Sequence, residues 1–109
     1  MSDNENKEKF EIYPYNSSIL VGDKGTIIKN NKTTETAETL EPFLSGEGYW
    51  MVKTSTNYYE YVHRLIAFTY VSGYTKERCV CHHKDNNRRN NNPKNLVWIS
   101  KKEHYAYHN

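Results

Sequence analysis

The stretch CVCHHKDNNRRNNNPKNLVW, residues 79–98, decides the fold of the second half of this chain. Two adjacent histidines, His82 and His83, precede a polar segment with six Asn between positions 86 and 95. The short segments CVCHH and LVWIS on either side predict two strands. Long loops without secondary structure are usually functional or disordered, but Asn side chains support turns. We therefore expect an ordered loop from Lys84 to Asn95 between two strands.

The end of the chain is predicted to be a helix that follows the second strand. Ser100 and Glu103 have the Ser-x-x-Glu spacing of a capping box. His104 and His108 are four residues apart and would lie on one face of this helix. With one strand histidine they would supply three imidazoles to a divalent metal and leave positions for water and substrate. The other strand histidine would point across the pleat and could act as a base.

The first 70 residues predict a mostly antiparallel sheet followed by one helix. Residues 1–10 are polar and predict a disordered tail. The segment ILVGDKGTIIK, residues 19–29, predicts a hairpin, and residues 40–62 predict two or three more short strands. The polar residues 30–39 predict a loop. Residues 63–71 have a helical period and end before Gly73, and we expect His63 to brace this helix.

The charge is distributed unevenly along the chain. Residues 1–50 contain five Lys and nine Asp or Glu, a net charge of −4, whereas residues 51–109 contain ten Lys or Arg and four Asp or Glu, a net charge of +6. A basic half fits a polyanion such as nucleic acid, although an ordinary solvated surface would also account for it. The sequence has no apolar run long enough to span a bilayer and no secretory signal. Two Cys two positions apart favour a reducing compartment, so we expect a cytoplasmic protein.

The segment VCHHKDNNRRNNNPKNLVWISKKEHYAYH, residues 80–108, resembles the HNH motif of the ββα-metal, or His-Me finger, nucleases. The preceding YYEYVHRLIAFTYV is similar to the lead-in of phage and intron-type HNH homing endonucleases, and ILVGDKGTIIK more weakly resembles a small N-terminal module of such proteins. The resemblance implies an α+β fold with an N-terminal antiparallel sheet and a C-terminal ββα-metal motif. It divides the chain into a tail (1–10), a β-rich module (11–57) and the HNH motif (58–109).

The resemblance also implies a role for each site residue. His82 and His104 would be metal ligands, and His108 matches the third histidine of colicin-type DNases. His83 would be the general base that activates water, and Asn95 would brace the loop and orient His83. The implied cofactor is one divalent metal, Mg²⁺ or Mn²⁺, with Zn²⁺ or Ni²⁺ as alternatives.

The implied partner is double-stranded DNA, cut to 5′-phosphate and 3′-hydroxyl ends by a phage- or virus-encoded enzyme. Cutting both strands would need a homodimer or two encounters. Basic side chains of the second half could hold the phosphates: Arg64, Lys84, Arg88, Arg89 and Lys94.

A second interpretation comes from another class of protein. Cys79, Cys81, His104 and His108 form the pattern Cys-x-Cys…His-x-x-x-His. This set could hold a structural zinc ion in a nucleic-acid-binding module without catalysis. The Cys pair is closer, and the gap longer, than in ordinary zinc fingers. The favoured interpretation of the cysteines is that they are small buried apolar residues.

Overall fold

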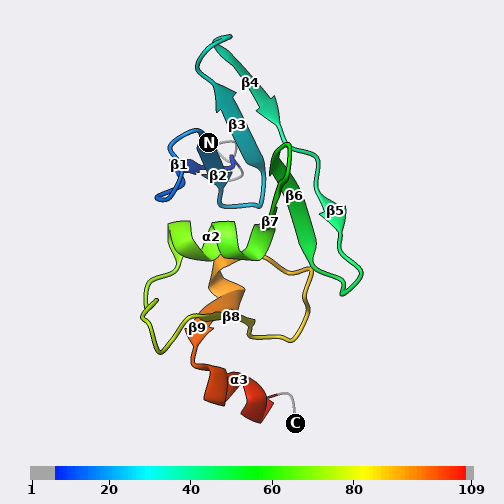
Figure 1. The fold of residues 1–109 in the computed structure, drawn as a ribbon. Helices are drawn as coiled ribbons and strands as arrows, with labels where there is room; N and C mark the ends of the chain where they lie inside the picture. Colours follow the sequence, from blue (N-terminus) through cyan, green and yellow to red (C-terminus); the bar gives the residue numbers. More distant parts are fainter. Residues whose placement is uncertain (1–6, 108–109) are drawn as a thin grey trace.

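The computed structural model describes residues 7–107, and its elements surround one central helix, α2 (Figure 1). In chain order the elements are β1 (Phe10–Ile12), β2 (Ile19–Gly22), β3 (Ile27–Asn31), β4 (Thr36–Thr39), β5 (Phe43–Leu44), β6 (Trp50–Ser55), β7 (Tyr58–Tyr61), α2 (Val62–Tyr70), β8 (Val80–His83), η1 (Pro93–Asn95), β9 (Leu96–Ile99) and α3 (Lys101–Tyr107). Small antiparallel sheets and helices confirm the predicted α+β class.

The first sheet has the order β1-β2-β3-β4 and includes the predicted hairpin. Ile19 pairs with Lys29 and Val21 with Ile27, so the register follows the sequence pattern. Residues 36–39, predicted as part of a loop, instead form β4 and pair with β3. All four side chains of β4 are exposed, so this strand has no apolar pattern by which it could be predicted. Its two Thr residues favour a strand by being β-branched.

The turn between β2 and β3 is held by the carboxylate of Glu8. Oε2 of Glu8 accepts hydrogen bonds from the backbone N–H groups of Lys24 (2.9 Å) and Thr26 (2.8 Å). A Cβ at Gly22 would overlap this carboxylate, which explains why glycine suits this position. Glu8 and Phe10 belong to the expected tail, but Glu8 makes these hydrogen bonds and Phe10, at the start of β1, pairs with Gly22 of β2. Residues 1–6 lie outside the described residues.

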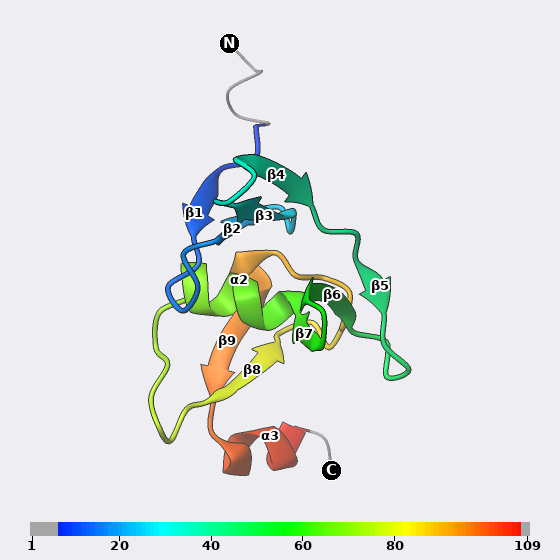
Figure 2. The same ribbon diagram turned by 45° about the horizontal axis from the view of Figure 1, so that its top comes forward.

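Helix α2 lies between the N-terminal sheets and the C-terminal strand pair (Figure 2). The helix predicted at residues 63–71 is confirmed with a shift of one residue at each end. Its buried residues join a core that draws side chains from both halves of the chain: Ile19, Val21, Ile27, Val52, Leu65, Ile66, Leu96 and Trp98. The proposed division after residue 57 falls in the turn between β6 and β7, and the core continues across it. The division into modules stays a prediction.

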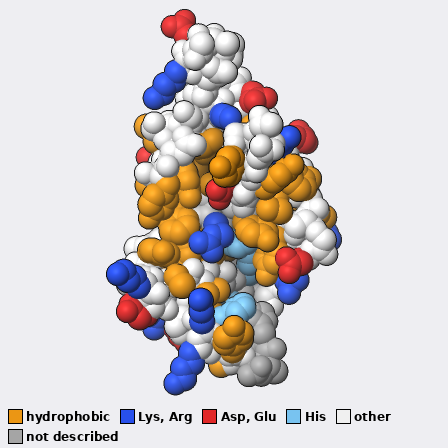
Figure 3. All heavy atoms as spheres, viewed as in Figure 1, with side chains coloured by type: hydrophobic (Ala, Val, Ile, Leu, Met, Phe, Trp, Pro, Cys, Tyr) orange, Lys and Arg blue, Asp and Glu red, His pale blue; other side chains and the backbone are white. Residues whose placement is uncertain are grey.

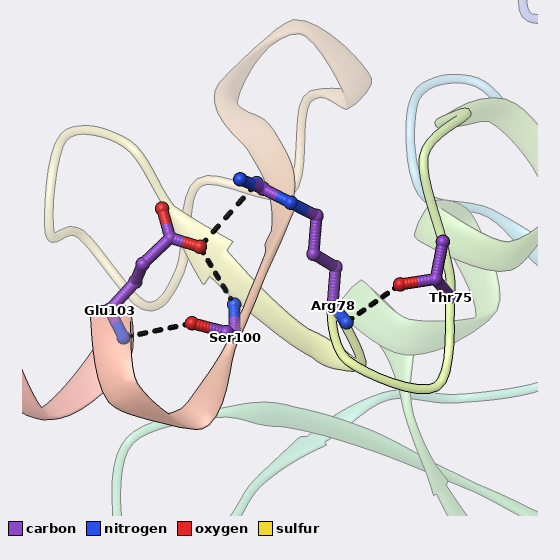
Figure 4. Close-up of polar contacts among 4 residues, drawn as sticks. All are labelled: Thr75, Arg78, Ser100 and Glu103. Carbon is purple, nitrogen blue, oxygen red and sulfur yellow. Dashed lines mark hydrogen bonds and ion pairs between the residues drawn. The ribbon is translucent and has the colours of Figure 1, made fainter.

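The predicted capping box begins helix α3 (Figure 4). The backbone N–H of Glu103 donates to Ser100 Oγ at 3.0 Å, and the backbone N–H of Ser100 donates to Glu103 Oε1 at 3.1 Å. Arg78 forms an ion pair with the same carboxylate at 3.5 Å. These contacts fix the first turn of α3, and with it the position of His104. Within residues 7–107, no helix has both the length and the apolar character needed to cross a membrane.

Candidate active site

The strand pair β8–β9 and helix α3 bring three histidines to one cleft. His82 pairs with Val97 and His83 with Leu96, as expected for the predicted strand pair. His82, His83 and His104 line a cleft of about 30 Å³, with further walls from Tyr49, Cys81, Asn86 and Arg88. Figure 3 shows pale blue histidine side chains at the surface beside blue Lys or Arg side chains and orange hydrophobic ones. The cleft is therefore small, open to solvent on one side and rich in nitrogen donors.

The side chain that holds His83 is Asn91. Nε2 of His83 lies 2.8 Å from Oδ1 of Asn91, and His83 is only 5% exposed. With an amide oxygen as its partner, Nε2 carries the proton and donates it, so Nδ1 keeps its lone pair. The sequence had suggested Asn95 for this task, but the structure shows its hydrogen bonds elsewhere.

Asn95 instead ties the loop together through Asp85. Its Nδ2 donates to Oδ1 of Asp85 and to the backbone oxygen of Asn90, both at 2.9 Å, and its Oδ1 accepts from the backbone N–H of Asp85 at 3.1 Å. Hydrogen bonds from Asn90, Asn87 and Asn95 hold the pKa of the Asp85 carboxyl below its usual value. The predicted ordered loop is confirmed, and its order comes from this Asx network.

A cluster of aromatic side chains behind His83 could not be seen in the sequence. The ring centre of His63, near the start of α2, lies 4.9 Å from that of His83. It also lies 5.1 Å from the ring centre of Tyr49 and 5.3 Å from that of Tyr61. His63 is 7% exposed, and its Nδ1 has no hydrogen-bond partner among the described residues. Burial, followed by the charges of His83 and Arg64, lowers the pKa of His63 to about 3. A neutral ring therefore packs against His83.

The residues present fit a divalent metal held by two imidazoles. His82 on β8 and His104 on α3 come from elements in contact and line the same cleft. Among residues 7–107, no three His, Cys, Asp or Glu side chains converge as a complete metal site. Such a two-residue site suits a metal whose remaining ligands are water and phosphate oxygens. The third expected ligand, His108, lies outside the described residues.

The cysteines fit the zinc interpretation less well. Cys81 lines the cleft, but its Sγ donates to the backbone oxygen of His63 at 3.8 Å. Burial raises the pKa of the Cys81 thiol to about 12. A zinc ligand is a thiolate, and this environment favours the protonated thiol. Both cysteines are partly buried and form no disulfide among the described residues, which agrees with the apolar role considered for them.

The structure separates the five cations expected to contact DNA. Arg88 lines the cleft, where its guanidinium lies 5.0 Å from the ring centre of Tyr49 and donates to the backbone oxygen of Glu47 at 2.6 Å. Arg89 lines another cavity, toward the β2–β3 turn. The guanidinium of Arg64 lies 5.4 Å from the ring centre of Phe68. The other two, Lys84 and Lys94, are exposed on the loop.

Sequence comparison finds similar proteins over the part of the chain that forms this cleft. Residues 60–106 match the family model of the HNH endonucleases. An uncharacterized HNH endonuclease of Acanthamoeba polyphaga mimivirus is 32% identical over 107 residues, which are 94% of this chain and 31% of that protein. A DNA gyrase protein of Synechocystis sp. is 54% identical over 33 residues, which are 30% of this chain and 3% of that protein.

Structural comparison extends the likeness beyond the motif. The fold is similar to that of the HNH homing endonuclease I-HmuI, in a solved structure titled for its DNA binding and cleavage. The match has a TM-score of 0.71 and 26% sequence identity, and it covers 93% of this chain and 56% of the I-HmuI chain. The chain thus spans less than two thirds of the viral relative and of I-HmuI. Residues 60–106 are thus similar in sequence to the HNH endonucleases, and most of the chain is similar in fold to one HNH homing endonuclease.

Proposed function

We propose that the protein is a metal-dependent DNA endonuclease that hydrolyses phosphodiester bonds with His83 as general base and one divalent cation. The observation that carries this proposal is the shared cleft of His82, His83 and His104, with the His83 ring held by Asn91. The similar fold of an endonuclease described as binding and cleaving DNA supports DNA as the substrate. The products would carry 5′-phosphate and 3′-hydroxyl ends.

His83 would take the proton from the attacking water. The bond to Asn91 keeps the proton of the neutral ring on Nε2, so Nδ1 can accept one from water. The water oxygen then forms its bond to phosphorus while the bond to the 3′ oxygen breaks. Imidazole is the commonest general base in enzymes, and such a base contributes about 10²–10⁴-fold in rate.

The ring of His63 acts on His83 as a positioning group. It touches the base from behind and is itself fixed by helix α2 and by Tyr49 and Tyr61. Because His63 is neutral, it adds no positive charge beside His83. Asn91 and His63 together leave the base little rotational freedom, which is how a productive geometry is preorganised.

His82 and His104 would hold the metal, and Arg88 would hold the substrate phosphate. When bound, a divalent cation neutralises the charge that develops on the phosphate and on the leaving oxygen. We propose Mg²⁺ or Mn²⁺, with Zn²⁺ or Ni²⁺ as alternatives because imidazole nitrogen is a better ligand for these ions. Arg88 lines the cleft and is held there by Tyr49 and by the backbone oxygen of Glu47, next to where a phosphate would bind.

Metal titration with single-turnover cleavage of DNA tests these roles. For His104→Ala we expect weaker metal affinity together with slower cleavage, partly restored by excess metal. For His83→Ala we expect unchanged metal affinity and a rate reduced by about 10²–10⁴-fold. Loss of metal binding in His83→Ala, or wild-type cleavage by that variant, would contradict the assignment.

A further inference from the structure

A row of aromatic side chains crosses the outer face of the sheet formed by β5, β6 and β7. Val52 of β6 is fully buried, so its neighbours Met51 and Lys53 face outward. Residues paired directly across antiparallel strands share a face. Phe43 on β5 is paired with Met51, and Tyr59 on β7 with Lys53, so both rings also lie on the outer face.

These outward-facing rings are exposed to solvent, and a lysine ammonium group lies close to one of them. Phe43 is 40% exposed and Tyr59 is 52% exposed. Their ring centres are 5.8 Å apart in an edge-to-face arrangement, and Nζ of Lys53 lies 5.9 Å from the centre of the Tyr59 ring. Two exposed rings in contact, next to an ammonium group, form a surface on which a flat ring and a neighbouring anion could bind together.

The row continues into the candidate active site. Tyr61, two residues after Tyr59 and on the same face, lies 5.5 Å from Tyr49. Tyr49 in turn lies 6.0 Å from His83 and beneath the guanidinium of Arg88. We call Phe43, Tyr59, Tyr61 and Tyr49 the aromatic row. Figure 3 shows orange side chains over this region, adjoining blue and pale blue ones.

We propose that the aromatic row binds unpaired nucleotides of the DNA strand next to the scissile phosphate, an inference that rests on the proposed function. Within a duplex, bases are stacked on one another at 3.4 Å along each strand, which leaves no room for a protein ring. An exposed ring can stack on an unpaired base directly, whereas inserting it into a duplex first requires neighbouring base pairs to unstack. Base–aromatic stacking of this kind, combined with a cationic groove, is how proteins hold single strands.

The charges along the aromatic row favour a nucleic acid over a second copy of the chain. The charged groups above its rings are both cations, Lys53 at one end and Arg88 at the other. A backbone that follows the row would pass from Lys53 to Arg88 and then to His83. Substrates with a gap, flap or fork at the cut site would fit this surface better than an intact duplex.

The test compares the binding of two fluorescent oligonucleotides, an intact duplex and the same duplex with a short single-stranded gap, in EDTA to prevent cleavage. The test variant is Phe43→Ala with Tyr59→Ala. The matched control is Tyr58→Ala, because Tyr58 is on the same strand and 69% exposed but faces the other side of the sheet. Thermal melting verifies that all variants fold.

We expect the double variant to lose roughly 10- to 100-fold in affinity for the gapped DNA, with little change for the duplex. The control should bind both as the wild type does. An equal loss on both DNAs, no loss on either, or a wild-type dimer that the double variant disrupts would overturn the inference. Ring-dependent binding of gapped DNA without any cleavage would refute the proposed function alone. In a parallel assay with Mg²⁺, cleavage of the gapped DNA by the double variant at the wild-type rate would refute this inference alone.

Discussion

Replacing Asn91 by alanine should slow DNA cleavage without changing metal affinity. The variant removes the 2.8 Å hydrogen bond to Nε2 of His83, a ring that is 5% exposed. A buried donor left without its partner costs about 1–3 kcal/mol. If that cost falls on the productive orientation of the ring, the rate should fall by about 5- to 150-fold. This is less than the loss expected on removing the base itself.

The assay for this prediction is single-turnover cleavage at saturating metal, beside calorimetric titration of the metal. Asn87→Ala is the matched control, because Asn87 is on the same loop and accepts a hydrogen bond from the backbone of Arg89 without touching His83. Its rate should stay near that of the wild type. If Asn91→Ala cleaves at the wild-type rate while Asn95→Ala is slow, Asn95 orients the base and the reasoning from this hydrogen bond is refuted.

Three other features of the site can be tested by substitution. The pKa of His63 falls from 6.5 in the unfolded chain to about 3 in the fold. As the pH drops below 6.5, the unfolded state therefore binds a proton at His63 before the folded state does. The free energy of unfolding should then fall by about 1.4 kcal/mol per pH unit. His63→Phe should flatten that slope in urea melts at pH 4–7, and an unchanged slope would exclude His63 as its source. Cys79→Ser with Cys81→Ser should retain metal binding and most activity, whereas loss of metal and of circular dichroism signal would favour the zinc interpretation. Arg88→Ala should lower the slope of log affinity for DNA against log salt concentration by about one unit. Arg89→Ala should lower this slope by less, because Arg89 lines another cavity. A larger effect of Arg89→Ala than of Arg88→Ala would place the DNA on the other side of the loop.

The elements with local signals could be predicted from the sequence. The capping box at Ser100 fixed the start of α3 because both of its hydrogen bonds join residues three apart. The helical period after His63 predicted α2 because its buried face repeats within nine residues. Strand β4 was missed because its side chains are all exposed, so its pairing with β3 has no apolar pattern.

The contacts inside the site depend on tertiary structure and could not be predicted. Six asparagines share the loop, and nothing in their spacing shows that Asn91, rather than Asn95, meets His83. The choice follows from loop geometry, including the left-handed backbone of Asn86 at φ 61°. The contact between His63 and His83 joins residues twenty positions apart that approach only when α2 packs on β8.

Plasmid cleavage with and without metal tests the central claim most directly. Supercoiled plasmid would be incubated with wild-type protein and with His83→Ala, prepared identically, in Mg²⁺, in Mn²⁺ and in excess EDTA. We expect the wild type to cut with metal and to stop in EDTA. Nicked plasmid should appear before linear plasmid, because the described residues of each chain form one histidine cleft; a homodimer would give linear plasmid directly. His83→Ala should be nearly inactive under all conditions. Sustained cutting by the wild type in excess EDTA, or equal cutting by His83→Ala, would contradict a metal-dependent endonuclease with His83 as its base.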